Sequence, residues 1–202
     1  MVPNLFKDFR TYNYMNKPEE PEIDSRYEEL VARSNQFYDA GDYEKALEIY
    51  EDASKLAPHY GFAWYMMGMA LFKMDKYDEA IGAFDMASSL DADRPEPHLG
   101  KSYVYIRIFD FENAIKALKK VYDVEKSVQT SGLLGLCYAL MGDVDEAFKW
   151  FVNAIDLNRK SAIKFFEDMY TEFVLMDKNI TSDEKVSIKT LIDKIVKKFS
   201  PE

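Results

Sequence analysis

Residues that could support catalysis or bind a metal are scarce in this chain of 202 residues. The two histidines, His59 and His98, each lie near the expected start of a helix, and neither has a second histidine or a cysteine at metal-ligand spacing. The one cysteine, Cys137, lies in an apolar stretch. A catalytic thiol needs a basic partner and an electropositive site, so a buried structural thiol is the better interpretation.

Other patterns that carry chemistry are also missing. Gly61, Gly68 and Gly82 are separated by helix-forming residues, so they do not make a phosphate-binding loop. Adjacent acids such as Glu19 and Glu20 would point apart on a helix instead of facing one substrate. We therefore predict no enzyme, no cofactor and no metal site. An enzyme that needs neither histidine nor cofactor stays open as an alternative.

One apolar pattern occurs four times along the chain. One position of the pattern holds alanine in all four copies, at intervals of 34, 34 and 33 residues: Ala46, Ala80, Ala114 and Ala147. The same intervals separate Tyr50, Phe84, Leu118 and Phe151. A period of this length is typical of stacked supersecondary units that share one continuous core. The chain is therefore expected to be a scaffold that presents a surface.

Each copy is predicted to be a pair of helices, because its apolar residues fall three or four apart. Asp42, Asp110 and Asp143 are expected to cap the second helices. The predicted pairs span residues 27–57, 61–92, 95–125 and 128–159, and two further helices follow. One residue is missing between Val121 and Gly135, so the joint between the third and fourth pairs should be tighter.

The repeat resembles the tetratricopeptide repeat (TPR) family, whose pattern places Trp, Leu-Gly, Tyr, Ala and Phe at fixed offsets. The second copy carries the fullest match, with Trp64, Gly68, Leu71, Tyr77, Ala80, Phe84 and Ala87. The resemblance covers about residues 27–161. It implies an all-α fold, a right-handed α-solenoid of helix-turn-helix repeats with C-terminal capping helices.

Three segments are expected: an aromatic-rich N-terminal arm and linker at 1–26, four repeats at 27–161, and capping helices at 162–202. The arm is crowded with apolar side chains, namely Leu5, Phe6, Phe9, Tyr12 and Tyr14. It could dock on a groove, its own or that of a twin chain, or it could cap the first repeat. The last helix, after Thr181, is amphipathic, and an alternative use for it is a membrane surface or a partner.

Composition narrows the class of protein. The net charge of −10 argues against a nucleic-acid partner, which needs a basic surface. The sequence has no run of 18 apolar residues, so no membrane span is expected. Residues 1–12 lack the apolar core of a signal peptide. One cysteine and ten methionines suit a reducing compartment, so an acidic cytoplasmic protein is expected.

In the family that the chain resembles, the first helices of successive repeats line a concave groove. The matching inward places are largely aromatic or apolar. The predicted partner-binding residues are Tyr38, Phe62, Tyr65, Met69, Phe72, Leu99, Tyr103 and Ile106, with Arg107 at the rim. The alternative is that these side chains are core, covered by a neighbouring helix. If they are exposed, truncating Tyr65 or Tyr103 should weaken a partner and leave folding nearly unchanged.

The family's receptors for chaperone tails clamp a terminal carboxylate with inward Lys, Asn and Arg. The matching places here carry Val31, Asn35, Met66, Glu96 and Gly100. Only Asn35 fits, so a carboxylate clamp is not expected.

Together these observations predict a non-enzymatic adaptor whose groove binds an apolar helix or extended peptide of another protein. An alternative is a self-assembling protein, for example a homodimer, in which the arm or the terminal helix fills the groove. A third is an enzyme's regulatory subunit.

Overall fold

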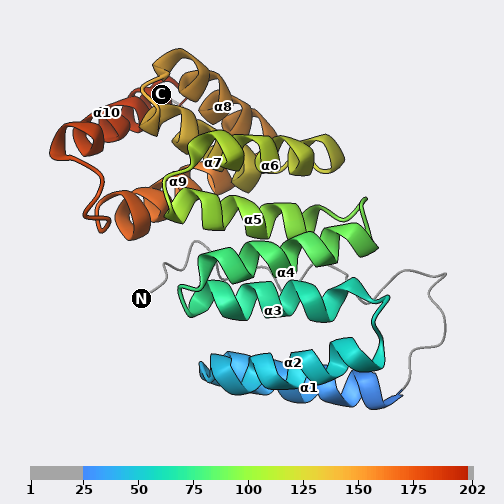
Figure 1. Ribbon diagram of the computed structural model, residues 1–202. Helices are drawn as coiled ribbons and strands as arrows, with labels where there is room; N and C mark the ends of the chain where they lie inside the picture. Colours follow the sequence, from blue (N-terminus) through green and yellow to red (C-terminus); the bar gives the residue numbers. More distant parts are fainter. Residues whose placement is uncertain (1–24, 200–202) are drawn as a thin grey trace. The chain divides into compact units, whose positions relative to one another are not determined.

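The structure is a computed structural model that describes residues 25–199, and every regular element in this range is helical (Figure 1). The elements are α1 (Ser25–Ala40), α2 (Tyr43–Leu56), α3 (Gly61–Lys73), α4 (Tyr77–Leu90), α5 (Pro95–Arg107), α6 (Phe111–Val124), α7 (Val128–Leu140), α8 (Val144–Leu157), α9 (Arg159–Met169), the π-helical turn η3 (Tyr170–Val174) and α10 (Ser182–Lys198). The predicted all-α fold of helix-turn-helix repeats is confirmed.

The helix bounds follow the sequence period closely. The first helices begin at Ser25, Gly61, Pro95 and Val128. Four residues join α2 to α3 and four join α4 to α5, whereas only three, Glu125 to Ser127, join α6 to α7. The tighter joint predicted between the third and fourth pairs is therefore confirmed.

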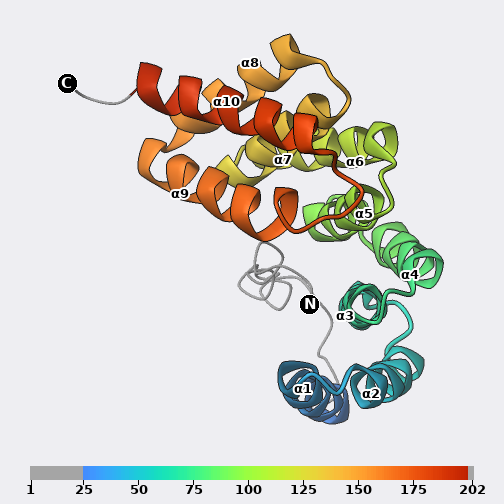
Figure 2. The same cartoon turned by 90° about the vertical axis from the view of Figure 1, so that its left-hand side faces the viewer.

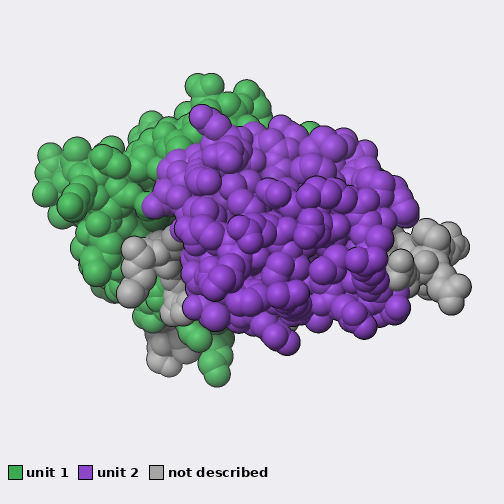
Figure 3. Space-filling view, turned by 60° about the horizontal axis from the view of Figure 1, so that its bottom comes forward, with its two compact units in different colours: residues 1–10, 105–202 green, residues 11–104 purple. Residues whose placement is uncertain are grey.

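The described residues form two compact units, which Figure 3 colours separately. Unit 2 holds residues 25–104, and unit 1 holds residues 105–199. The third helix pair begins in unit 2 and continues in unit 1, because α5 crosses the boundary. Each unit has a core of its own, described in turn below.

A phenylalanine wedged between glycines organises unit 2. Phe84 of α4 is fully buried, and a Cβ added to Gly68 of α3 would lie 2.6 Å from its ring. A Cβ on Gly100 of α5 would lie 2.5 Å from the same ring. Glycine at both places therefore lets α3 and α5 approach the ring from two sides. Figure 2 views α3 and α4 nearly end-on and shows them side by side.

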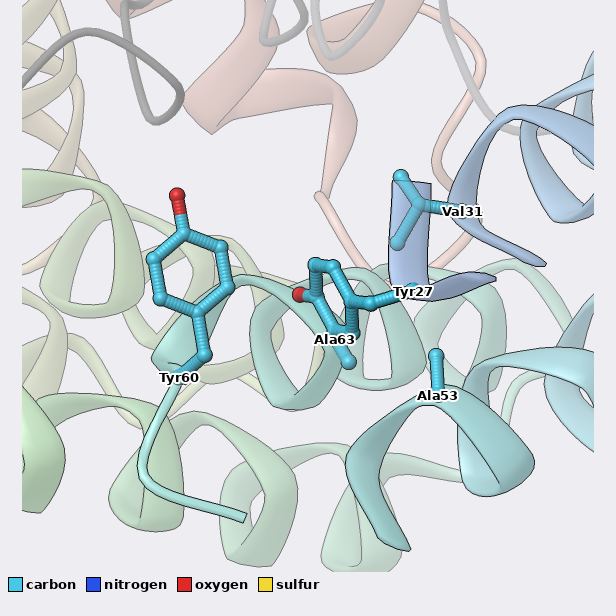
Figure 4. Close-up of a cluster of buried hydrophobic side chains, with 5 residues drawn as sticks. All are labelled: Tyr27, Val31, Ala53, Tyr60 and Ala63. Carbon is cyan, nitrogen blue, oxygen red and sulfur yellow. The ribbon is translucent and has the colours of Figure 1, made fainter. Parts of the chain in front are cut away.

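A second buried cluster lies where α1 meets the start of α3 (Figure 4). It contains Tyr27, Val31, Ala53, Tyr60 and Ala63. The rings of Tyr27 and Tyr60 meet edge to face, with centroids 5.2 Å apart. This arrangement is the favourable geometry for an aromatic pair. The cluster thus fixes the first helix pair to the second.

Each turn inside a helix pair contains one residue with positive φ. These residues are Gly41 (82°), Asp75 (59°), Phe109 (63°) and Gly142 (80°). The left-handed conformation helps to reverse the chain within the two or three residues that separate the paired helices, and glycine adopts it without a steric penalty. Asp75 and Phe109 adopt it as well, so the turn geometry is set by the packing of the helices and not by glycine alone.

The predicted helix caps are present. Asp42, Asp110 and Asp143 each accept a hydrogen bond from the backbone N–H three residues further on, at 3.3, 3.1 and 3.1 Å. Such caps satisfy backbone donors that the helix itself leaves unpaired. At α4 the corresponding residue is Lys76, which makes no side-chain cap. The capping box of α10 forms between Thr181 and Glu184, as its spacing predicts.

Unit 1 repeats the packing of unit 2 and extends it. A Cβ on Gly135 of α7 would lie 2.5 Å from the Phe151 ring of α8. On its other side Phe151 meets Phe166 of α9 edge to face, with centroids 5.0 Å apart. A Cβ on Gly132 would likewise come within 2.4 Å of the Phe165 ring. The helix α9 therefore lies where the first helix of another repeat would pack.

The last helix packs its apolar side inward. Its residues Ile188, Ile192 and Ile195 are at most 4% exposed, and α10 contacts α7 and α8. Its apolar side is therefore covered, which leaves it unavailable for a membrane surface. Within residues 25–199, no helix has both the length and the apolar content needed to cross a bilayer.

Two glycine-to-alanine substitutions in unit 2 should have opposite effects. Gly68→Ala should lower the free energy of unfolding by about 1–3 kcal/mol, because the new methyl group overlaps the Phe84 ring, which is confined by Gly100. In Gly82→Ala, the added Cβ on α4 meets no atom within 4 Å. This substitution should raise the free energy of unfolding by up to about 1 kcal/mol, because alanine has a higher helix propensity than glycine. Urea denaturation of both variants measures the difference. Equal changes of the same sign would contradict the close packing of the Phe84 ring against Gly68.

Candidate functional site

Seven predicted site residues lie in unit 2, on its first helices. Phe62, Tyr65, Met69 and Phe72 follow one another on α3 at helical spacing. Leu99 and Tyr103 are one turn apart on α5, and Tyr38 is on α1. The rings of Phe72 and Tyr103 are 6.4 Å apart, which joins the two helices. We call these seven residues the inner face: Tyr38, Phe62, Tyr65, Met69, Phe72, Leu99 and Tyr103.

The inner face is closed. Tyr65 is 2% exposed, Phe72 is 1% exposed and Tyr103 is fully buried. Tyr65 also lies against Phe84, with ring centroids 5.9 Å apart. The expectation that Tyr65 and Tyr103 are exposed is therefore wrong, and their burial agrees with the alternative that they are core side chains. Their role in binding a partner stays a prediction.

Two inner-face residues remain partly accessible. Phe62, at the first turn of α3, and Leu99, on α5, are half-buried. The ring of Phe62 lies 6.4 Å from that of Tyr65. An arriving apolar group can therefore meet Phe62 and Leu99 before any buried ring has to move.

The place that holds an asparagine in carboxylate-clamp receptors is used internally here. The Asn35 Oδ1 accepts a hydrogen bond from the Tyr50 hydroxyl at 2.5 Å. Val31 is fully buried and Met66 is 2% exposed. This side of α1 and α3 therefore offers apolar packing where a clamp would need cationic groups.

The two remaining predicted residues belong to unit 1. Ile106 is fully buried. Arg107 donates from Nη1 to the Asp177 Oδ2 at 3.3 Å, and its Nε is buried without a hydrogen-bond partner. A guanidinium has five N–H donors, so this pairing leaves capacity for a further acceptor.

Arg107 lines a pocket of about 350 Å³ in unit 1. The other lining residues are Glu172, Phe173, Met176, Asp177, Lys178 and Asn179. They come from the π-helical turn η3 and the segment that follows it, and such turns occur frequently at functional sites. Sequence reasoning missed this pocket. Arg107 and Asp177 are 70 residues apart, and no repeat or motif links them.

The described cysteine is not placed as a nucleophile. Cys137 is fully buried, and burial raises the pKa of its thiol above the ordinary value. A thiol held in its neutral form is a poor nucleophile. Among residues 25–199, no three His, Cys, Asp or Glu side chains come together as a metal site.

Methionines on the two sides of unit 2 provide a test of the closed inner face. Met69→Ala should lower the free energy of unfolding by about 2–5 kcal/mol, because Met69 is 3% exposed and its loss leaves a cavity. Met86→Ala on α4 is the matched control, since Met86 is 43% exposed and should change stability by less than about 0.5 kcal/mol. Chemical denaturation distinguishes them. A Met69→Ala chain as stable as the control would show that the face is open in solution.

The chain is similar to known repeat proteins. It is 26% identical over 142 residues to the TPR repeat-containing protein MJ1428 of Methanocaldococcus jannaschii, a match that covers 70% of this chain and 25% of that protein. The chain therefore spans about a quarter of the length of this relative.

Two solved structures show the same fold at low identity. MamA 41-end from Desulfovibrio magneticus RS-1 superposes with a TM-score of 0.67 and 18% identity, over 90% of this chain and all of that one. YrrB, titled a TPR protein with an unusual peptide-binding site, superposes with a TM-score of 0.60 and 16% identity, over 84% of this chain and 86% of that one.

Sequence models of the family match most of the repeat region. Residues 37–101 match one model described as tetratricopeptide repeat. Residues 96–127 and 128–167 match a second model of the same description. These matches continue along the helix pairs of both units, and the glycine-and-phenylalanine packing recurs in each. The chain belongs to the tetratricopeptide repeat family, and its fold is the predicted right-handed α-solenoid.

Proposed function

We propose that this protein is a non-enzymatic interaction scaffold whose inner face binds an apolar helix or extended segment of another protein. The observation that carries the proposal is the composition of that face. Six of its seven residues are aromatic or methionine, namely Tyr38, Phe62, Tyr65, Met69, Phe72 and Tyr103. Aromatic anchors contribute most of the binding energy at protein interfaces, and methionine adapts its shape to different partners.

Part of this face also packs the helices, since Phe72 meets Tyr103 and Tyr65 meets Phe84. The small residues of the repeat contact, Gly68 and Gly100, lie at other places of the motif. We infer that the aromatic character of the inner positions serves a partner as well as the packing. The comparison with YrrB is consistent with a peptide as the ligand class, because its title names a peptide-binding site.

Charge narrows the chemistry of the partner. Residues 25–104 carry eight Lys and Arg against fifteen Asp and Glu, a net charge of −7. Residues 105–199 carry fifteen of each and are neutral. An acidic surface accelerates association with a basic partner and disfavours an acidic one. We expect an apolar segment flanked by Lys or Arg.

The closed state affects affinity. A partner must first gain access to rings that are buried when the chain is alone, and the apparent dissociation constant rises as the open fraction falls. The half-buried Phe62 and Leu99 provide the initial contact. A moderate affinity that increases when the face is opened is therefore expected.

Selection from a displayed random-peptide library, followed by titration, tests the proposal. Selected peptides should be apolar with basic flanks. Phe62→Ala and Leu99→Ala should each weaken them at least about tenfold, which corresponds to 1.4 kcal/mol. Met86→Ala, on the exposed side of α4, should leave affinity unchanged. Selected peptides that bind both inner-face variants as tightly as the parent chain would contradict the site.

Self-assembly is the alternative, and the mass of the chain in solution tests it. Multi-angle light scattering should give the mass of one chain, 23.5 kDa. A stable dimer that Phe62→Ala dissociates would instead assign the inner face to a second copy of the chain.

A further inference from the structure

We propose that the pocket around Arg107 binds a free α-amino acid with an apolar side chain. The pocket belongs to unit 1, whereas the inner face, which carries the proposed function, belongs to unit 2. All the named lining residues are among the described ones, unlike residues 3–15 of the N-terminal arm, whose docking stays a prediction. The bonding of Arg107, the charges of the lining and the size of the pocket lead to this ligand class.

The Arg107 guanidinium is held in place but is not fully bonded. Its Nη1 donates to the Asp177 Oδ2 at 3.3 Å, and the Asp177 Oδ1 accepts from the backbone N–H of Asn179 at 2.9 Å. Among the described residues no acceptor meets the Nε of Arg107, which is buried. A buried donor without an acceptor is unfavourable, so a ligand that supplies an acceptor gains binding energy there.

The chemistry of arginine indicates which acceptor fits. A guanidinium binds a carboxylate most strongly through two parallel N–H groups. Because Asp177 is bonded to Nη1, the edge formed by Nε and Nη2 is the one on which a ligand carboxylate can form such a pair. The Arg107 side chain is 27% exposed, so a molecule in the pocket can reach it. We therefore expect the ligand to carry a carboxylate.

The charges that line the pocket balance. Arg107 and Lys178 are basic, and Glu172 and Asp177 are acidic. A ligand with a carboxylate alone would be repelled by Glu172. A carboxylate has about four acceptor sites, so Glu172 can accept from a ligand ammonium group in addition to the contact it already makes. A free α-amino acid carries both charged groups on one carbon, whereas each terminus of a peptide carries one of them.

The volume and the apolar lining limit the rest of the ligand. The pocket has about 350 Å³, which is at the low end of the range for small-molecule sites. Phe173 and Met176 supply apolar surface. Met176 is 76% exposed, and the unbranched methionine side chain adapts its shape to the group it meets. Leucine and phenylalanine are therefore suitable probes.

Isothermal titration calorimetry of the full chain with leucine and with phenylalanine tests the proposal. At least one of them should bind. For the tighter of the two, the amide lacks the carboxylate and the deaminated acid lacks the ammonium group. Each analogue should bind at least about tenfold more weakly, which corresponds to 1.4 kcal/mol. Failure of both amino acids to bind at millimolar concentration would overturn the proposal, as would analogues that bind equally well.

Variants of the lining assign the two charged groups. Arg107→Lys keeps the charge but removes the paired N–H geometry, so it should weaken the amino acid at least about tenfold. Glu172→Gln should weaken the amino acid relative to its deaminated analogue, and it keeps the test decisive if the first variant disturbs folding. Arg159→Lys and Glu167→Gln, on α9 and outside the pocket lining, are the matched controls and should bind like the parent chain.

The Nε–H resonance of Arg107 reports the contact directly. In a proton–nitrogen correlation spectrum it is identified by its loss in Arg107→Lys. It should shift when the amino acid is added and stay unchanged with the amide. An unchanged resonance while the amino acid binds would place the ligand elsewhere and overturn the proposal. Phe62→Ala tests the inner face and should leave this affinity unchanged, so the failure of one site is distinguishable from the failure of the other.

Discussion

The packing of one aromatic ring against glycine is the constraint on which the rest of the structure depends. Phe84 fills a space that exists only because Gly68 and Gly100 have no Cβ. Protein interiors tolerate little added volume, so this contact fixes both the identity of the residues and the approach of the helices. Phe151 makes the same contact with Gly135 and adds Phe166 of α9. The contact therefore recurs in each unit and extends to a helix that has lost the repeat motif.

Because these few positions hold neighbouring helices together, the other inward positions of the first helices can vary. In unit 2 they are filled by aromatic residues and methionine. The burial of these side chains adds to stability. Under the proposed function, they would also contact a partner once the face opens. The acidic charge of unit 2, compared with the neutral unit 1, would then favour basic partners.

Much of the fold could be predicted because it is local and periodic. The 34, 34 and 33 residue intervals gave the helix pairs and the tighter joint after α6, and the aspartates gave the caps. Helix α4 has Lys76 at the cap position and no side-chain cap, yet it begins at the expected place in the repeat. Packing can therefore define the start of a helix where the capping residue is missing. Helical spacing also assigned the seven inner-face residues to a common side, and this assignment stays a prediction.

The remaining features depend on contacts that spacing cannot encode. Periodicity predicts which side of a helix Tyr65 and Tyr103 occupy, but it does not predict whether another part of the chain covers that side. Burial therefore contradicted the expectation of exposed rings. The pocket around Arg107 and Asp177 joins segments 70 residues apart, beyond any local pattern.

The central claim is that the chain's own residues keep the inner face closed. Hydroxyl-radical footprinting of the intact chain tests it directly, because oxidation reports the solvent exposure of individual side chains. Met69, Tyr65 and Tyr103 should be as well protected as the core residue Tyr50, whereas Met86, which is 43% exposed, should be oxidised readily. Oxidation of Met69 as fast as that of Met86 would contradict the account.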